Sequence, residues 1–148
     1  MRYLWMVAAG LFLALNVSAQ ETTGNLERED FISKHVDDIK AELPARIDEG
    51  TTFFDIERQG DVILYTYRLD LDTSRYDAHR KAMLTTEMRQ LMCPDLEKGV
   101  CQYMKDVLDH GFQINSLYQD ENGIEIFQCV FMADMCFGKD NQVPEAKD

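Results

Sequence analysis

The stretch VILYTYRLDL, residues 62–71, carries the clearest structural signal in the chain. Large apolar and aromatic side chains occupy every second position, which is typical of a β-strand with one face against a core. The expected core face consists of Ile63, Tyr65, Tyr67 and Leu69. A second β-rich run at 51–58 precedes it across the Gly60-containing turn, so the two runs predict an antiparallel hairpin.

A second pair of β-rich runs lies toward the C-terminus. Residues 112–119 and 124–132 flank the turn DENG at 120–123, and its Asn-Gly step is a strong hairpin signal. We therefore expect a second antiparallel hairpin and four strands in total.

Helical periodicity occurs in three segments. Apolar residues recur at helical spacing over 26–43, and Pro44 is expected to end that helix because the residue before a proline avoids helical geometry. A second helix is expected over 75–92, closed at Pro94, and a third over 97–109. The expected inward stripe of the second helix consists of Tyr76, Met83, Leu84, Met88 and Leu91.

Together these elements predict an α+β protein. We expect a four-stranded antiparallel sheet with helices packed on one face, stabilised by disulfides. The folded part is expected to be a single domain over residues 26–137, preceded by a flexible segment at 20–25 and followed by a disordered tail at 138–148.

The N-terminus predicts export. A basic start and a short apolar run lead to small residues before Gln20, so residues 1–19 are expected to be a signal peptide cleaved after Ala19. The alternative, a membrane anchor, fits less well because a bilayer span needs about 20 apolar residues. No membrane insertion is expected after cleavage, and the protein is expected to be periplasmic or secreted. No cysteine lies immediately after the cleavage point, so a lipid-anchored form is not expected.

The chain is acidic, with a formal net charge of −12. Such a surface repels phosphate backbones and anionic lipids, which argues against nucleic-acid binding and against membrane-surface binding. The same charge favours basic partners.

Four cysteines, an even number in an exported chain, predict two disulfides with three possible pairings. They are Cys93, Cys101, Cys129 and Cys136. A zinc site would need ligands at short spacing such as C-x2-C, which this chain lacks. No metal and no cofactor are therefore expected.

The order of these motifs resembles the quorum-sensing-regulated virulence factor family of small exported bacterial proteins. The matching residues are Leu43-Pro44, Thr51, Leu64-Tyr65-Thr66-Tyr67, Cys93, Gly111, the segment 118–123 and Ala133-Asp134-Met135-Cys136. The resemblance spans residues 26–137. It implies an α+β fold, a disulfide between the end of the long helix and the C-terminus, and no established chemistry. This chain departs from the pattern by two extra cysteines and a longer segment before Gly111, so Cys93 and Cys101 are both candidates for the helix-end cysteine.

Geometry bears on the pairing as well. If Cys129 lies in a straight strand, seven residues of extension carry Cys136 roughly 23 Å away, whereas a disulfide needs Cα atoms within about 7 Å. A Cys129–Cys136 bridge would therefore require a sharp reversal after Met132. We favour one bridge between the helical region and Cys136.

No catalytic motif stands out. His79 beside Asp77 could act as a general base, but a solvated histidine on a helix face is the simpler interpretation. No G-x-S-x-G motif or phosphate-binding loop occurs. The acidic residues near 70–72 and 120–122 do not follow an EF-hand spacing, and turn residues explain them. We assign no catalytic residue.

Aromatic residues are concentrated in the expected strands. They are Phe54, Tyr65, Tyr67, Tyr118, Phe127 and Phe131. Ordinary sheet core is one interpretation, because aromatics favour strands. The other is an aromatic-lined groove for a peptide or helix. The candidate binding residues are Tyr65, Tyr67, Tyr118 and Phe127.

These observations favour a non-enzymatic exported accessory protein that binds another envelope or extracellular protein. A pilotin-like factor for a secretion channel is one version, although such factors typically carry a lipid anchor. The alternative is a small secreted hydrolase or a hydrolase inhibitor, which would need a cleft with perturbed acid and base groups.

Overall fold

The computed structural model describes the backbone of residues 11–138 and the side chains of residues 23–138. The chain divides into two units between His35 and Val36. Helix α1 (Leu11–Lys40) forms the described part of the first unit and ends in the second. It starts before the predicted helix and includes residues 20–25, which the sequence predicted to be flexible. Most of the predicted signal peptide and of the predicted tail, residues 1–10 and 139–148, lies outside the described residues.

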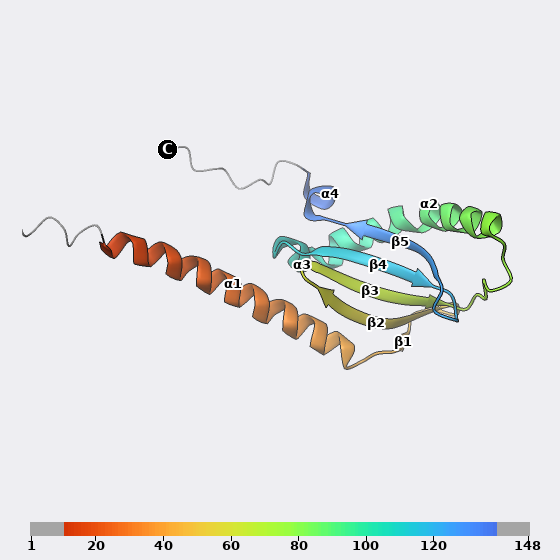
Figure 1. Ribbon diagram of the computed structural model, residues 1–148, viewed down its shortest axis with the longest axis horizontal. Coiled ribbons are helices and arrows are strands. Elements are labelled where there is room, and N and C mark those ends of the chain that lie inside the picture. The colour runs from red at the N-terminus through yellow and green to blue at the C-terminus, as the bar shows by residue number, and fades with distance from the viewer. Residues whose placement is uncertain (1–10, 139–148) are drawn as a thin grey trace, which may run out of the picture. The chain divides into compact units, whose positions relative to one another are not determined.

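The second unit is built around a five-stranded sheet in the order β1-β2-β3-β4-β5 (Figure 1). Its strands are β1 (Ala45–Arg46), β2 (Thr51–Gln59), β3 (Val62–Leu69), β4 (Gln113–Gln119) and β5 (Glu125–Phe131). Both predicted hairpins are present, since β2 pairs antiparallel with β3 and β4 pairs antiparallel with β5.

The prediction of a purely antiparallel, four-stranded sheet is wrong in two respects. β3 and β4 pair in parallel, because the helices between them return the chain to the end of the sheet where β3 starts. The short strand β1, which was not predicted, pairs with Thr52 and Phe53 of β2. A two-residue strand has too little alternation to be recognised in a sequence.

One long helix replaces the two helices predicted between the hairpins. α2 (Ala78–Tyr103) contains Pro94 in its interior, and only the short α3 (Lys105–Asp109) follows it. The helix begins after Asp77, whose side chain accepts a hydrogen bond from the backbone N–H of Arg80 at 2.8 Å. Proline tends to break helices but does not always do so, and here α2 is tied to the rest of the unit on both sides of Pro94.

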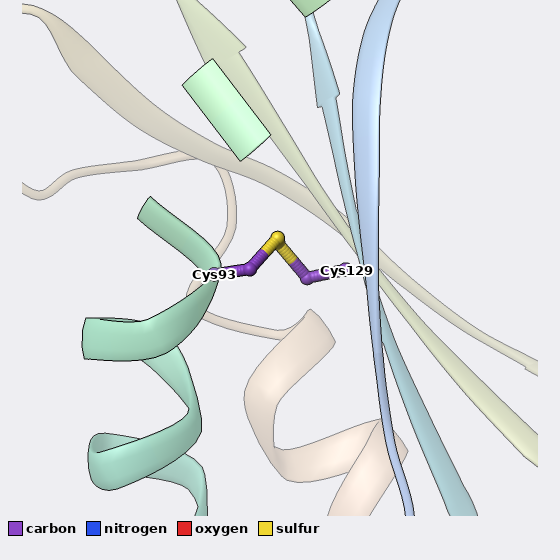
Figure 2. Close-up of a disulfide and its surroundings, with 2 residues drawn as sticks. All are labelled: Cys93 and Cys129. Carbon is purple, nitrogen blue, oxygen red and sulfur yellow. A yellow bond between two sulfur atoms is a disulfide. The ribbon is translucent and has the colours of Figure 1, made fainter. Parts of the chain in front are cut away.

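Both predicted disulfides form, and both involve α2. Cys93 bonds to Cys129 of β5, with Cα atoms 5.7 Å apart (Figure 2). Cys101 bonds to Cys136 of α4 (Ala133–Phe137), with Cα atoms 5.2 Å apart. The favoured bridge from the helical region to Cys136 is confirmed, and Cys101 rather than Cys93 provides it.

One face of the sheet supplies most of the core. The predicted core face of β3 is confirmed for Ile63, Tyr65 and Leu69, which are buried, while Tyr67 is half-buried. On β4 the residues alternate between buried and half-buried, as one covered face and one open face require.

Helix α2 covers less of this face than its sequence predicted. It packs along β5 at the edge of the sheet (Figure 1). There Thr85 Oγ1 donates to the carbonyl of Ile126 at 2.6 Å. Val100 is its one buried residue in the described structure, and two members of the predicted inward stripe, Met83 and Leu91, are exposed. Because α2 follows the edge strand rather than the centre of the sheet, its apolar stripe is only partly covered.

Candidate binding groove

Four aromatic rings form a continuous row across the sheet. They lie at paired positions on β2, β3, β4 and β5: Phe53, Tyr67, Tyr118 and Phe127. Neighbouring ring centroids are 5.0, 4.9 and 4.5 Å apart, and the rings are stacked. Paired side chains of adjacent strands lie close enough for such contacts, which stabilise a sheet. The row connects all four long strands on the core face.

Most residues of this row were candidates from the sequence. Tyr67, Tyr118 and Phe127 are members, and Tyr65 lies beside it with its ring 5.8 Å from Phe53. Phe53 was missed. A register shift between Phe53 and Asp55 interrupts the alternation of β2, so counting every second residue selects Phe54 instead.

Phe54 belongs to the opposite face. Its ring lies 3.4 Å from the guanidinium carbon of Arg68, a residue of the open side of β3. Phe131, in contrast, is buried on the core side of β5.

Burial keeps the tyrosines of the core face neutral. It raises the pKa of Tyr67 to about 12, and it also raises the pKa values of Tyr65 and Tyr118 above the ordinary range. Their phenols therefore stay protonated at neutral pH, which suits packing and hydrogen bonding rather than proton abstraction.

A groove of about 480 Å³ lies between the second half of α2 and the sheet. Its lining residues are Tyr67, Leu91, Met92, Asp95, Leu96, Gly99, Val100, Tyr103, Met104 and Ser116. Helix α2 provides most of the wall, while Tyr67 of β3 and Ser116 of β4 come from the sheet. We call this the α2 groove. Its volume and apolar lining are typical of a binding site.

Two large apolar side chains of the wall are exposed to solvent. Leu91 is 71% exposed and Tyr103 is 79% exposed. The cysteines at 93 and 101 lie between them, so both disulfides fix this part of the helix. The exposed groups are therefore presented by a covalently anchored helix, not by a mobile loop.

The charge at the groove is negative and sparse. Among the described lining residues, Asp95 carries the one formal charge, and its carboxylate lies 3.0 Å from Lys98 Nζ. Both side chains are 79% exposed, so this ion pair is screened by water.

A polar cluster joins the β4–β5 turn to the loop after β3. Asp120 is fully buried and accepts four hydrogen bonds: from the backbone N–H and the hydroxyl of Thr73, at 3.1 and 2.7 Å, and from the backbone N–H groups of Asn122 and Ile124, at 2.9 and 2.8 Å. We call these four residues the Asp120 clasp. Burial alone would raise the pKa of Asp120, but the hydrogen bonds outweigh it and lower the pKa below its usual value. The turn interpretation of these acidic residues thus accounts for Asp120.

Two histidines, the candidate His79 and His110, lie away from the groove. His79 is exposed near the start of α2. His110 is exposed after α3, with Nδ1 2.6 Å from the carbonyl oxygen of Asp106. Neither lines the α2 groove, so neither is placed for acid–base chemistry there.

Among the described residues, no group of three or more His, Cys, Asp or Glu side chains is arranged to hold a metal ion. No helix in this part of the chain combines the length and apolarity that crossing a membrane requires.

No protein-family model matches the chain, and no curated protein matches it in sequence. Solved structures match it in fold. A protein of Pseudomonas aeruginosa described as secreted superposes with a TM-score of 0.60 at 13% identity, over 76% of this chain and 96% of that one. The pilotin of the Vibrio vulnificus type 2 secretion system gives a TM-score of 0.53 at 14% identity, over 78% of this chain and 96% of that one. At these identities the likeness establishes a shared fold.

Proposed function

We propose that this protein is a non-enzymatic exported accessory protein that binds another envelope or extracellular protein through the α2 groove. The observation that carries the proposal is the pair of exposed apolar side chains, Leu91 and Tyr103, on a helix held by two disulfides beside an apolar groove. A folded protein gains nothing in its own stability from such exposure, and exposed apolar surface beside a groove is typical of a site completed by a partner.

The fold and the cysteines support the proposed export. Disulfides persist in oxidising compartments, which agrees with the predicted export to the periplasm or the medium. The fold is shared with a protein described as secreted and with a secretion-system pilotin. We also propose that the protein is related to the quorum-sensing-regulated virulence factor family of small exported bacterial proteins.

The expected occupant is an amphipathic helix with an apolar face and basic flanks. Leu91 and Tyr103 are separated by about 18 Å along α2, which a partner helix of about three turns would match. Its apolar side chains would pack on Tyr67, Leu91 and Tyr103. Its basic flanks would be attracted by a chain whose formal net charge is −12.

Site-specific photo-crosslinking in intact envelopes tests the proposal. A photoreactive phenylalanine analogue replaces Tyr103 in the tagged protein, and cross-linked products are identified by mass spectrometry. We expect one abundant envelope or secreted protein, joined through a helical segment with apolar and basic residues.

The matched control places the same analogue at Glu87, an exposed residue of α2 that does not line the groove. Equal capture of the same protein from both positions would show that the groove is not the docking site. Absence of any product from position 103, in cells where the tagged protein is exported and folded, would contradict the proposed function.

A further inference from the structure

Two methionines line the α2 groove. Met92 precedes the disulfide cysteine Cys93, and Met104 follows the last residue of α2. Both residues are half-buried, so neither is enclosed in the core. Methionines elsewhere in the described chain are also exposed, Met83 at 50% and Met135 at 43%, but these do not line the groove.

We infer that Met92 and Met104 are modification sites, and that their oxidation to methionine sulfoxide by a peroxide closes the α2 groove to its occupant. This inference rests on the proposed function and adds a form of control to the same site. The reaction transfers one oxygen atom: the thioether sulfur loses two electrons and forms an S=O bond, the O–O bond of hydrogen peroxide breaks, and water leaves. Methionine sulfoxide reductases reverse the modification.

The lining explains why a sulfoxide would matter at these two positions. Unmodified methionine is flexible and apolar, so it adapts to the side chains of an occupant. A sulfoxide oxygen is hydrated while the groove is open, and the apolar face of an occupant offers it no donor. Asp95 carries the one formal charge of the described lining, and its carboxylate can only accept hydrogen bonds at neutral pH. The possible donors of the lining are the hydroxyls of Tyr67, Tyr103 and Ser116, so an occupied groove offers a sulfoxide oxygen fewer donors than water does. Covering one sulfoxide should therefore weaken binding about tenfold.

Oxidation of Met92 and Met104 is expected to affect the groove and not the fold. Both disulfides already fix the helix around the groove, and the methionines do not belong to the fully buried core. Oxidation should therefore change the surface of the groove while the fold persists.

The test uses the disulfide-intact protein and a fluorescent amphipathic helix of leucines and lysines as the probe. Binding is measured by fluorescence anisotropy before and after hydrogen peroxide treatment, and peptide mass spectrometry reports the extent of oxidation at each methionine. We expect the untreated protein to bind the probe and the treated protein to bind at least about tenfold more weakly. The Met92→Leu/Met104→Leu variant should keep its affinity after treatment, because leucine preserves volume and cannot be oxidised.

Met83→Leu is the matched control and should lose affinity on oxidation as the unsubstituted protein does. Unchanged affinity in protein shown to carry sulfoxides at Met92 and Met104 would overturn the inference while leaving the groove as the binding site. Resistance of both methionines under conditions that convert Met83 would also overturn it. Failure of the untreated protein to bind the probe would count against the proposed function itself, and the inference would fall with it.

Discussion

At the Asp120 clasp a buried carboxylate has four hydrogen-bond donors around it, whereas along the α2 groove large apolar side chains remain in water. Both regions involve the connection between the two hairpins. The clasp joins the loop after β3 to the β4–β5 turn, and the groove lies between α2 and the sheet. The clasp therefore contributes to stability within the chain, whereas the apolar surface of the groove stays exposed, as the proposed docking site requires.

The largest effect on stability is expected from the disulfide that fixes the groove wall. Replacing Cys93 and Cys129 together by alanine should lower the free energy of unfolding by about 4 kcal/mol, because a loop of some 36 residues is no longer closed in the unfolded chain. Urea denaturation under non-reducing conditions measures the loss.

The second disulfide provides the matched control. Its separation of 35 residues gives nearly the same loop entropy, but both of its cysteines are half-buried, whereas Cys129 is 2% exposed. The Cys101→Ala/Cys136→Ala variant should therefore lose somewhat less, because it leaves no gap in the core. A greater loss from this pair would show that the contact between α2 and α4 matters more than the contact between α2 and the sheet.

Asp120→Ala should lower the free energy of unfolding by about 3 kcal/mol, because it leaves buried N–H and hydroxyl donors without an acceptor. Equilibrium denaturation measures it. Asp95→Ala, at the groove rim, is the control: its ion pair with Lys98 is exposed, so the change should stay within about 0.5 kcal/mol. Similar losses from both variants would remove the distinction between the two regions.

The lowered pKa of Asp120 makes the stability of the unsubstituted protein depend on pH. Its contribution to stability is present above the pKa of the unfolded chain and is lost as the pH falls through the lower pKa of the folded state. The unsubstituted protein should therefore lose stability in acid more steeply than Asp120→Asn does.

The aromatic row gives the opposite dependence on pH. Burial raises the pKa of Tyr67 to about 12. The folded chain therefore keeps this proton to a higher pH than the unfolded chain, whose tyrosines titrate at about 10. The stability associated with it is present below the unfolded value and is lost as the pH rises through about 12. Tyr67→Phe keeps the ring and removes the titrating group, so its urea midpoint should fall less steeply in alkali. An unchanged slope would mean that Tyr67 is more hydrated than its position indicates.

Local patterns in the sequence predicted the hairpins well. The alternation at 62–69 and the Asn-Gly turn at 122–123 are determined by neighbouring residues, and both appear in the structure as expected. The parallel pairing of β3 with β4 could not be predicted in this way, because it depends on where a long helical connection returns the chain. The prediction that a helix ends at Pro94 failed for a related reason. Contacts distant in sequence outweigh the local tendency of proline to break a helix.

The groove was only partly visible in the sequence. The aromatic candidates led to Tyr67, but Tyr118 and Phe127 are buried at 3% and 1% exposure and belong to the core. The wall residues Leu91 and Tyr103 gave no such signal, since an apolar stripe on a helix normally predicts burial. The disulfide between Cys93 and Cys129 holds α2 at the edge strand, and part of the apolar stripe of α2 therefore remains exposed.

The smallest effect on stability should come from the groove itself. Leu91→Ser and Tyr103→Ser should change the free energy of unfolding by no more than about 0.5 kcal/mol, because both side chains are already in water. The same variants should weaken capture of the proposed partner at least about tenfold, since exposed apolar anchors contribute mainly to an interface. Quantitative co-purification from envelopes, alongside urea denaturation, measures the two effects separately.

Met83→Ser is the matched control for this pair, because Met83 is 50% exposed on the same helix and lies outside the groove. It should leave both stability and capture unchanged. If it weakened capture as much as Leu91→Ser does, the partner would contact the whole exposed side of α2, and the groove would not be the specific docking site. If Leu91→Ser instead destabilised the fold by more than about 1 kcal/mol, the apolar wall would belong to the core, and the contrast with the Asp120 clasp would disappear.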